Sequence, residues 1–125
     1  MKVMMRFLGI VMLLAGSTVF AQENNNILVN QLDDNMYEVS ILHDNGAILE
    51  KGVLLDGKCE GTWTRYTETG MIAAIANYSN GMKDGVWQIY SADGALSYEM
   101  VYEKNERLIA KTFDGGGETV SYRIR

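Results

Sequence analysis

The feature that most constrains the fold of this chain is a repeat with a period of 24 residues. Trp63 recurs as Trp87, and Tyr66 recurs as Tyr90. Three pairs of glycines keep the same spacing: Gly57 and Gly81, Gly61 and Gly85, Gly70 and Gly94. A period of this length is typical of repeat proteins, in which each unit is a small element that buries its apolar face against its neighbours.

Each unit is predicted to form a β-hairpin, because short alternating runs are separated by Asn, Asp and Gly and helical spacing is never sustained. The first arms are residues 39–42, 63–66 and 87–90, and the second arms are 47–54, 71–78 and 95–102. Glycine closes each turn, where a positive φ is expected. The predicted fold is an all-β, single-domain, twisted antiparallel meander of about nine strands. Its structural repeat positions are Gly46, Gly57, Gly61, Tyr66, Gly70, Tyr78, Gly81, Gly85, Tyr90, Gly94 and Tyr102.

The chain is predicted to divide into a signal peptide (1–21), a polar leader (22–26) and the repeat domain (27–125). Two basic residues precede an apolar run from Phe7 to Ala15, and small residues precede the expected cleavage after Ala21. The run is too short to span a bilayer, which takes about 20 apolar residues. Ser17 stands where a lipoprotein signal would need cysteine. We therefore expect an exported periplasmic or secreted protein that is not a lipoprotein and meets the membrane only through its signal.

After cleavage the chain would keep nine basic residues against sixteen acidic ones, a formal charge of −7. A phosphate backbone would be repelled by such a surface, so nucleic acid is not an expected partner. Only one cysteine is present, so an internal disulfide is excluded. The absence of proline suits a continuous hydrogen-bonded sheet.

The segments Gly61-Thr-Trp-Thr-Arg-Tyr and Asn77-Tyr-Ser-Asn-Gly-Met-Lys-Asp-Gly-Val-Trp resemble the bacterial variant of the MORN (membrane occupation and recognition nexus) repeat. The resemblance covers roughly Val39 to Asn105. It implies a ribbon of antiparallel hairpins; members are mostly of unknown function, and some carry an antitoxin label. The first copy departs from the pattern in lacking its aromatic pair, and the third in lacking its linking glycines.

The sequence predicts no catalytic residue, no cofactor and no metal site. His43, the only histidine, aligns with Thr67 and Ser91 and is interpreted as a solvated turn residue. Cys59 shares its repeat position with Lys83 and Arg107, which indicates an exposed linker and a free thiol able to join two chains. Asp33-Asp34-Asn35 and Asp114–Glu118 are rich in oxygen donors, but they lack EF-hand spacing and are interpreted as turns.

The aromatic residues leave one question open. Trp63 and Tyr66 are three positions apart, so a regular strand would place them on opposite faces. We expect the tyrosines in the core, with Tyr78 and Tyr102. The tryptophans are either core or part of an exposed surface, and Trp63, Arg65 and Trp87 form the candidate binding surface.

The expected function is that of a non-enzymatic module that binds a partner protein or an envelope component through its sheet face or an edge strand. Homo-oligomers through edge strands are a further expectation. The alternatives are a carbohydrate-binding module that uses the tryptophan row and, from the family labels, an antitoxin-like inhibitor.

Overall fold

The computed structural model describes residues 26–115 and 119–123, with side chains described for residues 26–115. The predicted signal peptide (1–21), most of the predicted leader and the segment Gly116–Glu118 lie outside the described residues. Ten strands are present in the described part: β1 (Ile27–Asp33), β2 (Met36–Leu42), β3 (Ile48–Leu55), β4 (Lys58–Tyr66), β5 (Ile72–Ser79), β6 (Met82–Lys83), β7 (Gly85–Tyr90), β8 (Leu96–Glu103), β9 (Glu106–Phe113) and β10 (Thr119–Arg123).

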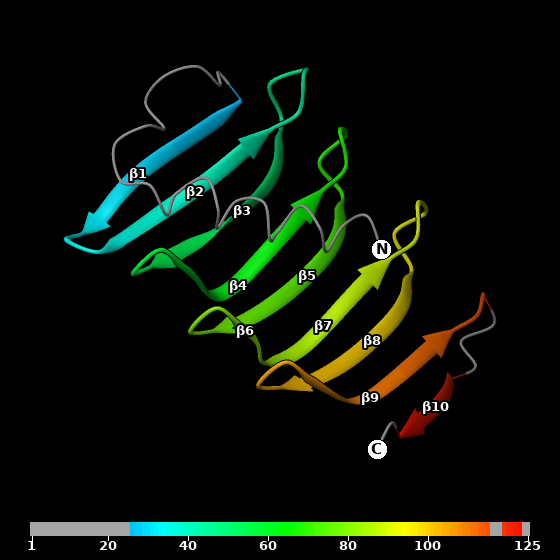
Figure 1. The fold of residues 1–125 in the computed structure, drawn as a ribbon. Helices are drawn as coiled ribbons and strands as arrows, with labels where there is room; N and C mark the ends of the chain where they lie inside the picture. The colour runs from blue at the N-terminus through cyan, green and yellow to red at the C-terminus, as the bar shows by residue number, and fades with distance from the viewer. Residues whose placement is uncertain (1–25, 116–118, 124–125) are drawn as a thin grey trace.

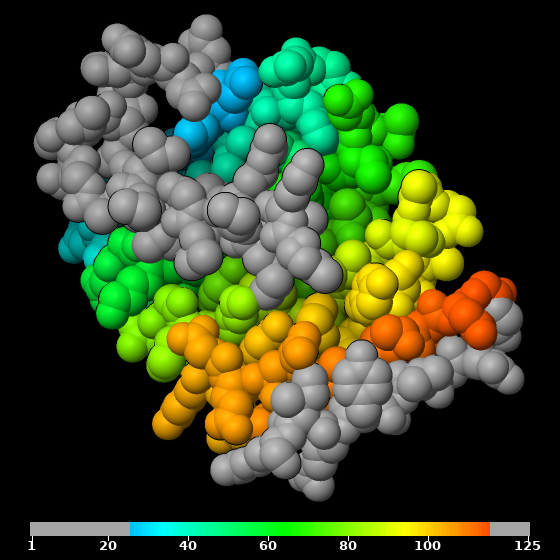
Figure 2. Space-filling view, turned by 45° about the vertical axis from the view of Figure 1, so that its right-hand side comes forward, coloured from blue at the N-terminus to red at the C-terminus, as the bar shows by residue number. Residues whose placement is uncertain are grey.

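The strands form one antiparallel sheet in which spatial order follows chain order, with the two-residue strand β6 pairing beside β7 on β5. The sheet curves but does not close, so β1 and β10 lie at its two ends and point in the same direction (Figure 1). In the space-filling view the strands cross the molecule in order from blue to orange (Figure 2). The predicted all-β antiparallel meander is confirmed.

Two kinds of turn alternate along the chain. At one end of the sheet, the turn after β2 is closed by bonds from His43 N to Ala47 O (2.7 Å) and from Gly46 N to His43 O (2.9 Å). The same two bonds recur in the turns that begin at Thr67 and Ser91. At the other end, two-residue turns have positive φ at both positions, as in type I′ hairpins: Asp56-Gly57, Asn80-Gly81 and Lys104-Asn105.

One face of the sheet carries a row of cross-strand neighbours in which each indole lies beside a small residue. Trp63 lies opposite Ala76, and Trp87 lies opposite Met100. A Cβ atom on Gly52 would lie 2.0 Å from Cδ2 of Trp63, so the indole rests directly on the backbone of β3. Small residues therefore make room for the indoles, and this row forms the core: Val39, Gly52, Trp63, Ala76, Trp87, Met100 and Ala110.

The opposite face is more polar, as predicted for a meander with one buried side. Gln88 donates a hydrogen bond to Glu99 (3.0 Å), and Lys111 forms an ion pair with the same carboxylate (3.2 Å). The hydrogen bond from Gln88, and then that from Lys111, lower the pKa of Glu99. On the same face, Lys51 of β3 lies 3.8 Å from Glu38 of β2. Cross-strand pairs of this kind stabilise a sheet without an apolar layer over it.

Candidate functional site

Both tryptophans of the candidate binding surface are buried, with exposed fractions of 0 % for Trp63 and 3 % for Trp87. Each ring N–H donates to a backbone carbonyl ten residues earlier in the chain: Trp63 Nε1 to Val53 O (3.1 Å) and Trp87 Nε1 to Asn77 O (2.8 Å). Of the two alternatives that the sequence left open for the tryptophans, the structure shows the core, so the candidate binding surface of Trp63, Arg65 and Trp87 is wrong. The indoles have their polar atom bonded within the sheet and their faces packed against it.

The tyrosines divide between two environments. Tyr78 and Tyr102 are buried and flank the ring of Trp87, with ring centroids 5.1 Å and 5.3 Å away. Tyr66 and Tyr90 are only half-buried, so the expectation that they share the core is wrong. The physical reason is that the tryptophans occupy the core face, and three positions along a strand lead to the opposite face, where the hydroxyl of Tyr90 donates to Gln88 (3.2 Å).

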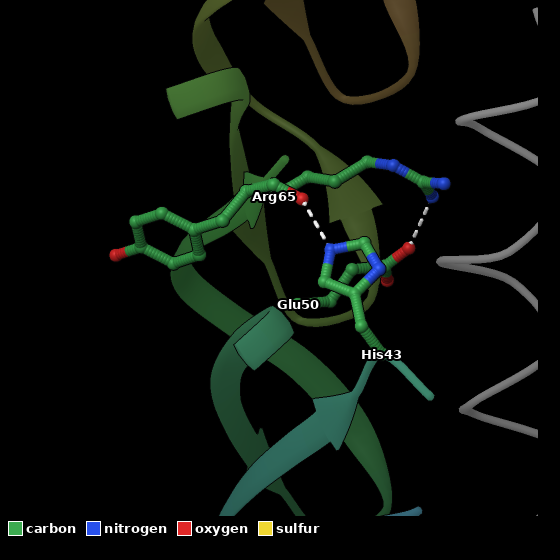
Figure 3. A network of polar contacts seen from close by, with 4 residues as sticks. His43, Glu50 and Arg65 are labelled. Atoms are coloured by element: carbon green, nitrogen blue, oxygen red, sulfur yellow. Dashed lines mark hydrogen bonds and ion pairs between the residues drawn. The ribbon is translucent and has the colours of Figure 1, made fainter. Parts of the chain in front are cut away.

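Arg65 belongs to a polar cluster and not to an open surface. Its guanidinium Nη1 lies 2.6 Å from Oε1 of Glu50, a carboxylate with an exposed fraction of 0 % (Figure 3). Glu50 and Arg65 are direct cross-strand partners on β3 and β4. The equivalent pair in the next unit is Ala74 and Ile89, which is apolar. In this unit the ion pair therefore occupies the place that an apolar pair has in the next unit.

His43 joins two turns. Its Nε2 atom lies 2.9 Å from the carbonyl oxygen of Tyr66 (Figure 3). In the same turn, the side-chain amide of Asn45 donates to Glu68 O (3.3 Å). The ring is partly buried between neighbouring turns, whereas the sequence suggested a solvated position. These bonds give His43 a structural role in holding successive hairpins in register.

Cys59 lies on the core face, where it is 1 % exposed and sits opposite Leu54. Burial, with the charge of Glu50 as the smaller cause, raises the pKa of its thiol to about 12. The prediction of an exposed thiol is wrong, because β4 begins at Lys58 and brings Cys59 into the sheet. A thiol in this position is neutral and shielded, so it is not placed to join two chains.

Lys83 occupies the position equivalent to Cys59 in the next unit. Its ammonium lies 5.3 Å from the ring centroid of Trp87 and 5.2 Å from that of Tyr102. Desolvation, and then the charge of Arg107, lower the pKa of Lys83. The sequence offered no sign of this cation–π contact, because lysine in a turn usually indicates solvent exposure.

Of the two acidic turns considered as calcium loops, Asp33-Asp34-Asn35 bonds to its own and the adjacent turn, and part of Asp114–Glu118 lies outside the described residues. Asn35 donates to the carboxylate of Asp56 in the adjacent turn (2.6 Å), and Asp33 accepts from the N–H of Asp34. Within residues 26–115 and 119–123, no three His, Cys, Asp or Glu side chains are grouped so that they could hold a metal ion. No helix in this part of the chain is long and apolar enough to cross a membrane.

Among the strands that the structure describes, β1 and β10 each lack a neighbour on one side, so the two ends of the sheet present unpaired backbone. β1 is the more apolar of the two edges, and its side chains Leu28 and Leu32 are 56 % and 49 % exposed. The remaining large exposed apolar residues are scattered over turns and central strands: Ile48, Met71, Ile72, Val86 and Tyr98. Within the described residues, the β1 edge therefore combines unpaired backbone with exposed apolar side chains.

Comparison with known proteins identifies the repeats. Residues 60–80 and 83–104 match the family described as "MORN repeat variant". No curated protein matches the chain. A solved structure titled "Crystal structure of GtfA/B complex" aligns with 82 % of this chain and 20 % of that chain, at 13 % sequence identity and a TM-score of 0.49. This chain thus spans about a fifth of the length of that protein. The resemblance seen in the sequence is confirmed: the chain carries two repeats of the MORN variant family.

Proposed function

We propose that this chain is a non-enzymatic, exported module that binds a partner protein or envelope component by adding a strand at an open edge of its sheet. The observation that carries the proposal is the open meander, in which β1 and β10 each have one neighbour. An unpaired edge strand presents a row of N–H and C=O groups that another extended chain can pair with.

The two faces are less suited to binding than the edges. The apolar face is filled by the chain's own aromatic side chains, and both indole N–H groups are bonded to backbone. The same observations disfavour carbohydrate stacking on Trp63 and Trp87, since a sugar ring needs an exposed aromatic face. On the opposite face, polar side chains such as Gln88, Glu99 and Lys111 bond to one another.

The absence of enzymatic activity is part of the proposal and is supported by how the two reactive side chains are placed. The ring of His43 bonds to a backbone carbonyl, and burial keeps the thiol of Cys59 protonated. Cys59 faces the core near the start of β4, whereas His43 lies in the turn after the end of β2. These two positions are at opposite ends of the sheet. A nucleophile and its base need to lie within hydrogen-bond reach of each other.

Export rests on the sequence of residues 1–21, with its basic start, short apolar run and small residues before Gln22. The proposed location is the periplasm or the exterior of the cell.

The test is crosslinking of a C-terminally tagged copy in its native host, followed by mass spectrometry of what is captured. We expect the tagged chain outside the cytoplasm, beginning near Gln22, together with a stoichiometric protein or envelope component. Recovery of a cytoplasmic chain that keeps residues 1–21 would contradict export. Turnover of a substrate that is lost on His43→Ala or Cys59→Ala would contradict the non-enzymatic role.

A further inference from the structure

We propose that β1 pairs with β1 of a second copy of this chain, in antiparallel register about a two-fold axis at Asn30. The inference deepens the proposed function by naming one partner for the open edge, and it rests on that function. It starts from the composition of β1, whose residues Ile27–Leu32 carry no charge. Natural edge strands are usually protected by lysine, proline or inward-pointing charges, and this segment has none of them.

The backbone of β1 determines which residues can pair outward. Leu42 N donates to Asn26 O (2.7 Å), so the polar groups of Asn26 point toward β2. Because these groups alternate along a strand, those of Ile27, Val29 and Gln31 point away from the sheet. The free edge therefore offers three hydrogen-bonding residues, of which Val29 and Gln31 lie on either side of Asn30.

A two-fold axis at Asn30 makes this edge complementary to itself. Val29 then lies opposite Gln31 of the second copy in a hydrogen-bonded pair, and Asn30 lies opposite Asn30. Leu28 lies opposite Leu32 in a non-hydrogen-bonded pair, the type that brings side chains closest. Both leucines are among the most exposed apolar residues of the described chain, and this register covers them. The register of β1 with β2 is regular from Ile27 to Gln31, and Leu32 lies in the bulge between Gln31 and Asp33, at the outer end of the paired segment.

The direction of the strands favours this arrangement over head-to-tail stacking. β1 and β10 run in the same direction (Figure 1), so joining β10 of one copy to β1 of the next by translation would create a parallel pair. Every pairing within the sheet is antiparallel. A two-fold pair of β1 strands keeps the antiparallel pattern and closes as a dimer, whereas head-to-tail stacking leads to an open filament.

The pairing also extends the apolar face. Ile27 packs against the core cluster, and Val29 lies opposite Val39 in the same row. Both side chains are only half-buried at the end of the sheet. A second sheet joined at β1 would place its own Gln31 opposite Val29 and its own Val29 diagonally across from it, so the apolar rows of the two copies would meet at the axis.

The first experiment measures the mass of the purified full chain by sedimentation equilibrium, with mass spectrometry recording its N-terminus. We expect a dimer. Leu28→Lys/Leu32→Lys places like charges opposite each other and should raise the dissociation constant at least about tenfold. Leu28→Lys/Leu32→Glu places opposite charges across the axis and should restore the dimer. The two positions are about 13 Å apart within one strand, so the introduced charges cannot pair inside one copy.

The matched control is Ile72→Lys, which adds a charge at an exposed apolar residue of the central strand β5 and should leave the dimer unchanged. A second measurement uses Asn30→Cys, because facing residues of a non-hydrogen-bonded pair lie within disulfide distance. It should give a covalent dimer under oxidising conditions, whereas Glu68→Cys, in an exposed turn, should not.

A monomeric native chain, or failure of the Lys/Glu variant to recover the dimer that the Lys/Lys variant loses, would overturn the pairing. So would the absence of a covalent dimer from Asn30→Cys. These outcomes are separate from a failure of the proposed function. A chain that is monomeric when purified but captures another protein in the host would refute self-pairing and leave the binding role intact.

Discussion

Two neighbouring units of the sheet hold a tryptophan in the same way but surround it with different groups. In both, a tryptophan donates its ring N–H to a backbone carbonyl ten residues earlier. In the β3–β4 unit, Trp63 lies on Gly52 beside the Glu50–Arg65 ion pair. In the β5–β7 unit, Trp87 lies between Tyr78 and Tyr102, and Lys83 covers its ring.

The comparison shows which parts of the repeat are structural requirements. The indole and its backbone hydrogen bond are kept, because together they fill the core and satisfy a buried polar group. The groups around the indole vary between glycine, cysteine, lysine and an ion pair. The contribution of each variable position can therefore be measured by exchanging it with its equivalent 24 residues away.

The largest effects are expected where the units agree. Trp63→Ala and Trp87→Ala should each lower the free energy of unfolding by about 3–5 kcal/mol, the usual cost of removing a buried aromatic ring. Chemical denaturation followed by circular dichroism measures this. Val86→Ala, at an exposed position beside Trp87, is the control and should have little effect. A cost below about 1 kcal/mol at Trp63 would place this residue outside the core.

The next effect concerns the reactivity of Cys59, which the second unit replaces with Lys83. A pKa raised from 9.0 to about 12 leaves about a thousandfold less thiolate near pH 8 than a free thiol has. Alkylation of the folded chain should be slower by at least that factor and should become fast on unfolding. Rapid labelling without loss of structure would contradict the buried position.

The same shift gives the sign of a pH dependence. Below about pH 9 the thiol is neutral in both states, so stability is unaffected. Above this pH the unfolded chain loses the proton and the folded chain keeps it, so the folded state should lose stability as the pH rises toward 12. Denaturation of Cys59→Ala across this range is the control, since its stability should fall less steeply.

The ion pair is the clearest difference between the units. Arg65→Met removes the cation from a buried carboxylate and should cost about 3 kcal/mol, the lower part of the usual range because Arg65 is 18 % exposed. Glu50→Ala/Arg65→Ile copies the Ala74–Ile89 pair and should be neutral or stabilising by about 1–4 kcal/mol. If the double variant is as unstable as the single one, the two units do not share a packing position.

A smaller difference between the two units is the size of the side chain at position 52. Gly52→Ala should cost about 2 kcal/mol, because its Cβ and the indole of Trp63 cannot occupy the same space. The cost should shrink in a Trp63→Leu background, and a double-mutant cycle measures the coupling. Gly46→Ala is the comparison, since that site is open and only its φ of +86° is strained. Equal costs of Gly52→Ala in both backgrounds would contradict the contact.

The smallest effect is expected in the turns. Lys104 has a φ of +47° at the position held by Asn80 in the preceding turn. Lys104→Asn should raise the free energy of unfolding by about 0.5 kcal/mol, because asparagine tolerates this conformation better than lysine. The change is measurable as a shift of the denaturation midpoint, and a loss of stability would indicate that the lysine side chain makes a compensating contact.

The repeat predicted the meander, the turns and the paired faces, because a 24-residue period places equivalent residues on equivalent strands. It did not predict the side on which the tryptophans lie. Alternation places Trp63 and Tyr66 on opposite faces, but it does not tell which of the two faces is buried. Cys59 was misplaced because turn composition suggested a linker where β4 had already begun. The proposed binding site is therefore the edge of the sheet and not its tryptophan face.

The most direct test of binding at the edge places a photo-crosslinking residue, benzoylphenylalanine, at Asn30 on β1 or at Val86 on a central strand, in the native host. We predict crosslinks from Asn30, to a second copy of the chain or to another protein, and none from the exposed but central Val86. Crosslinks from Val86 with none from Asn30 would show that the chain binds through its face, and would refute binding at the β1 edge.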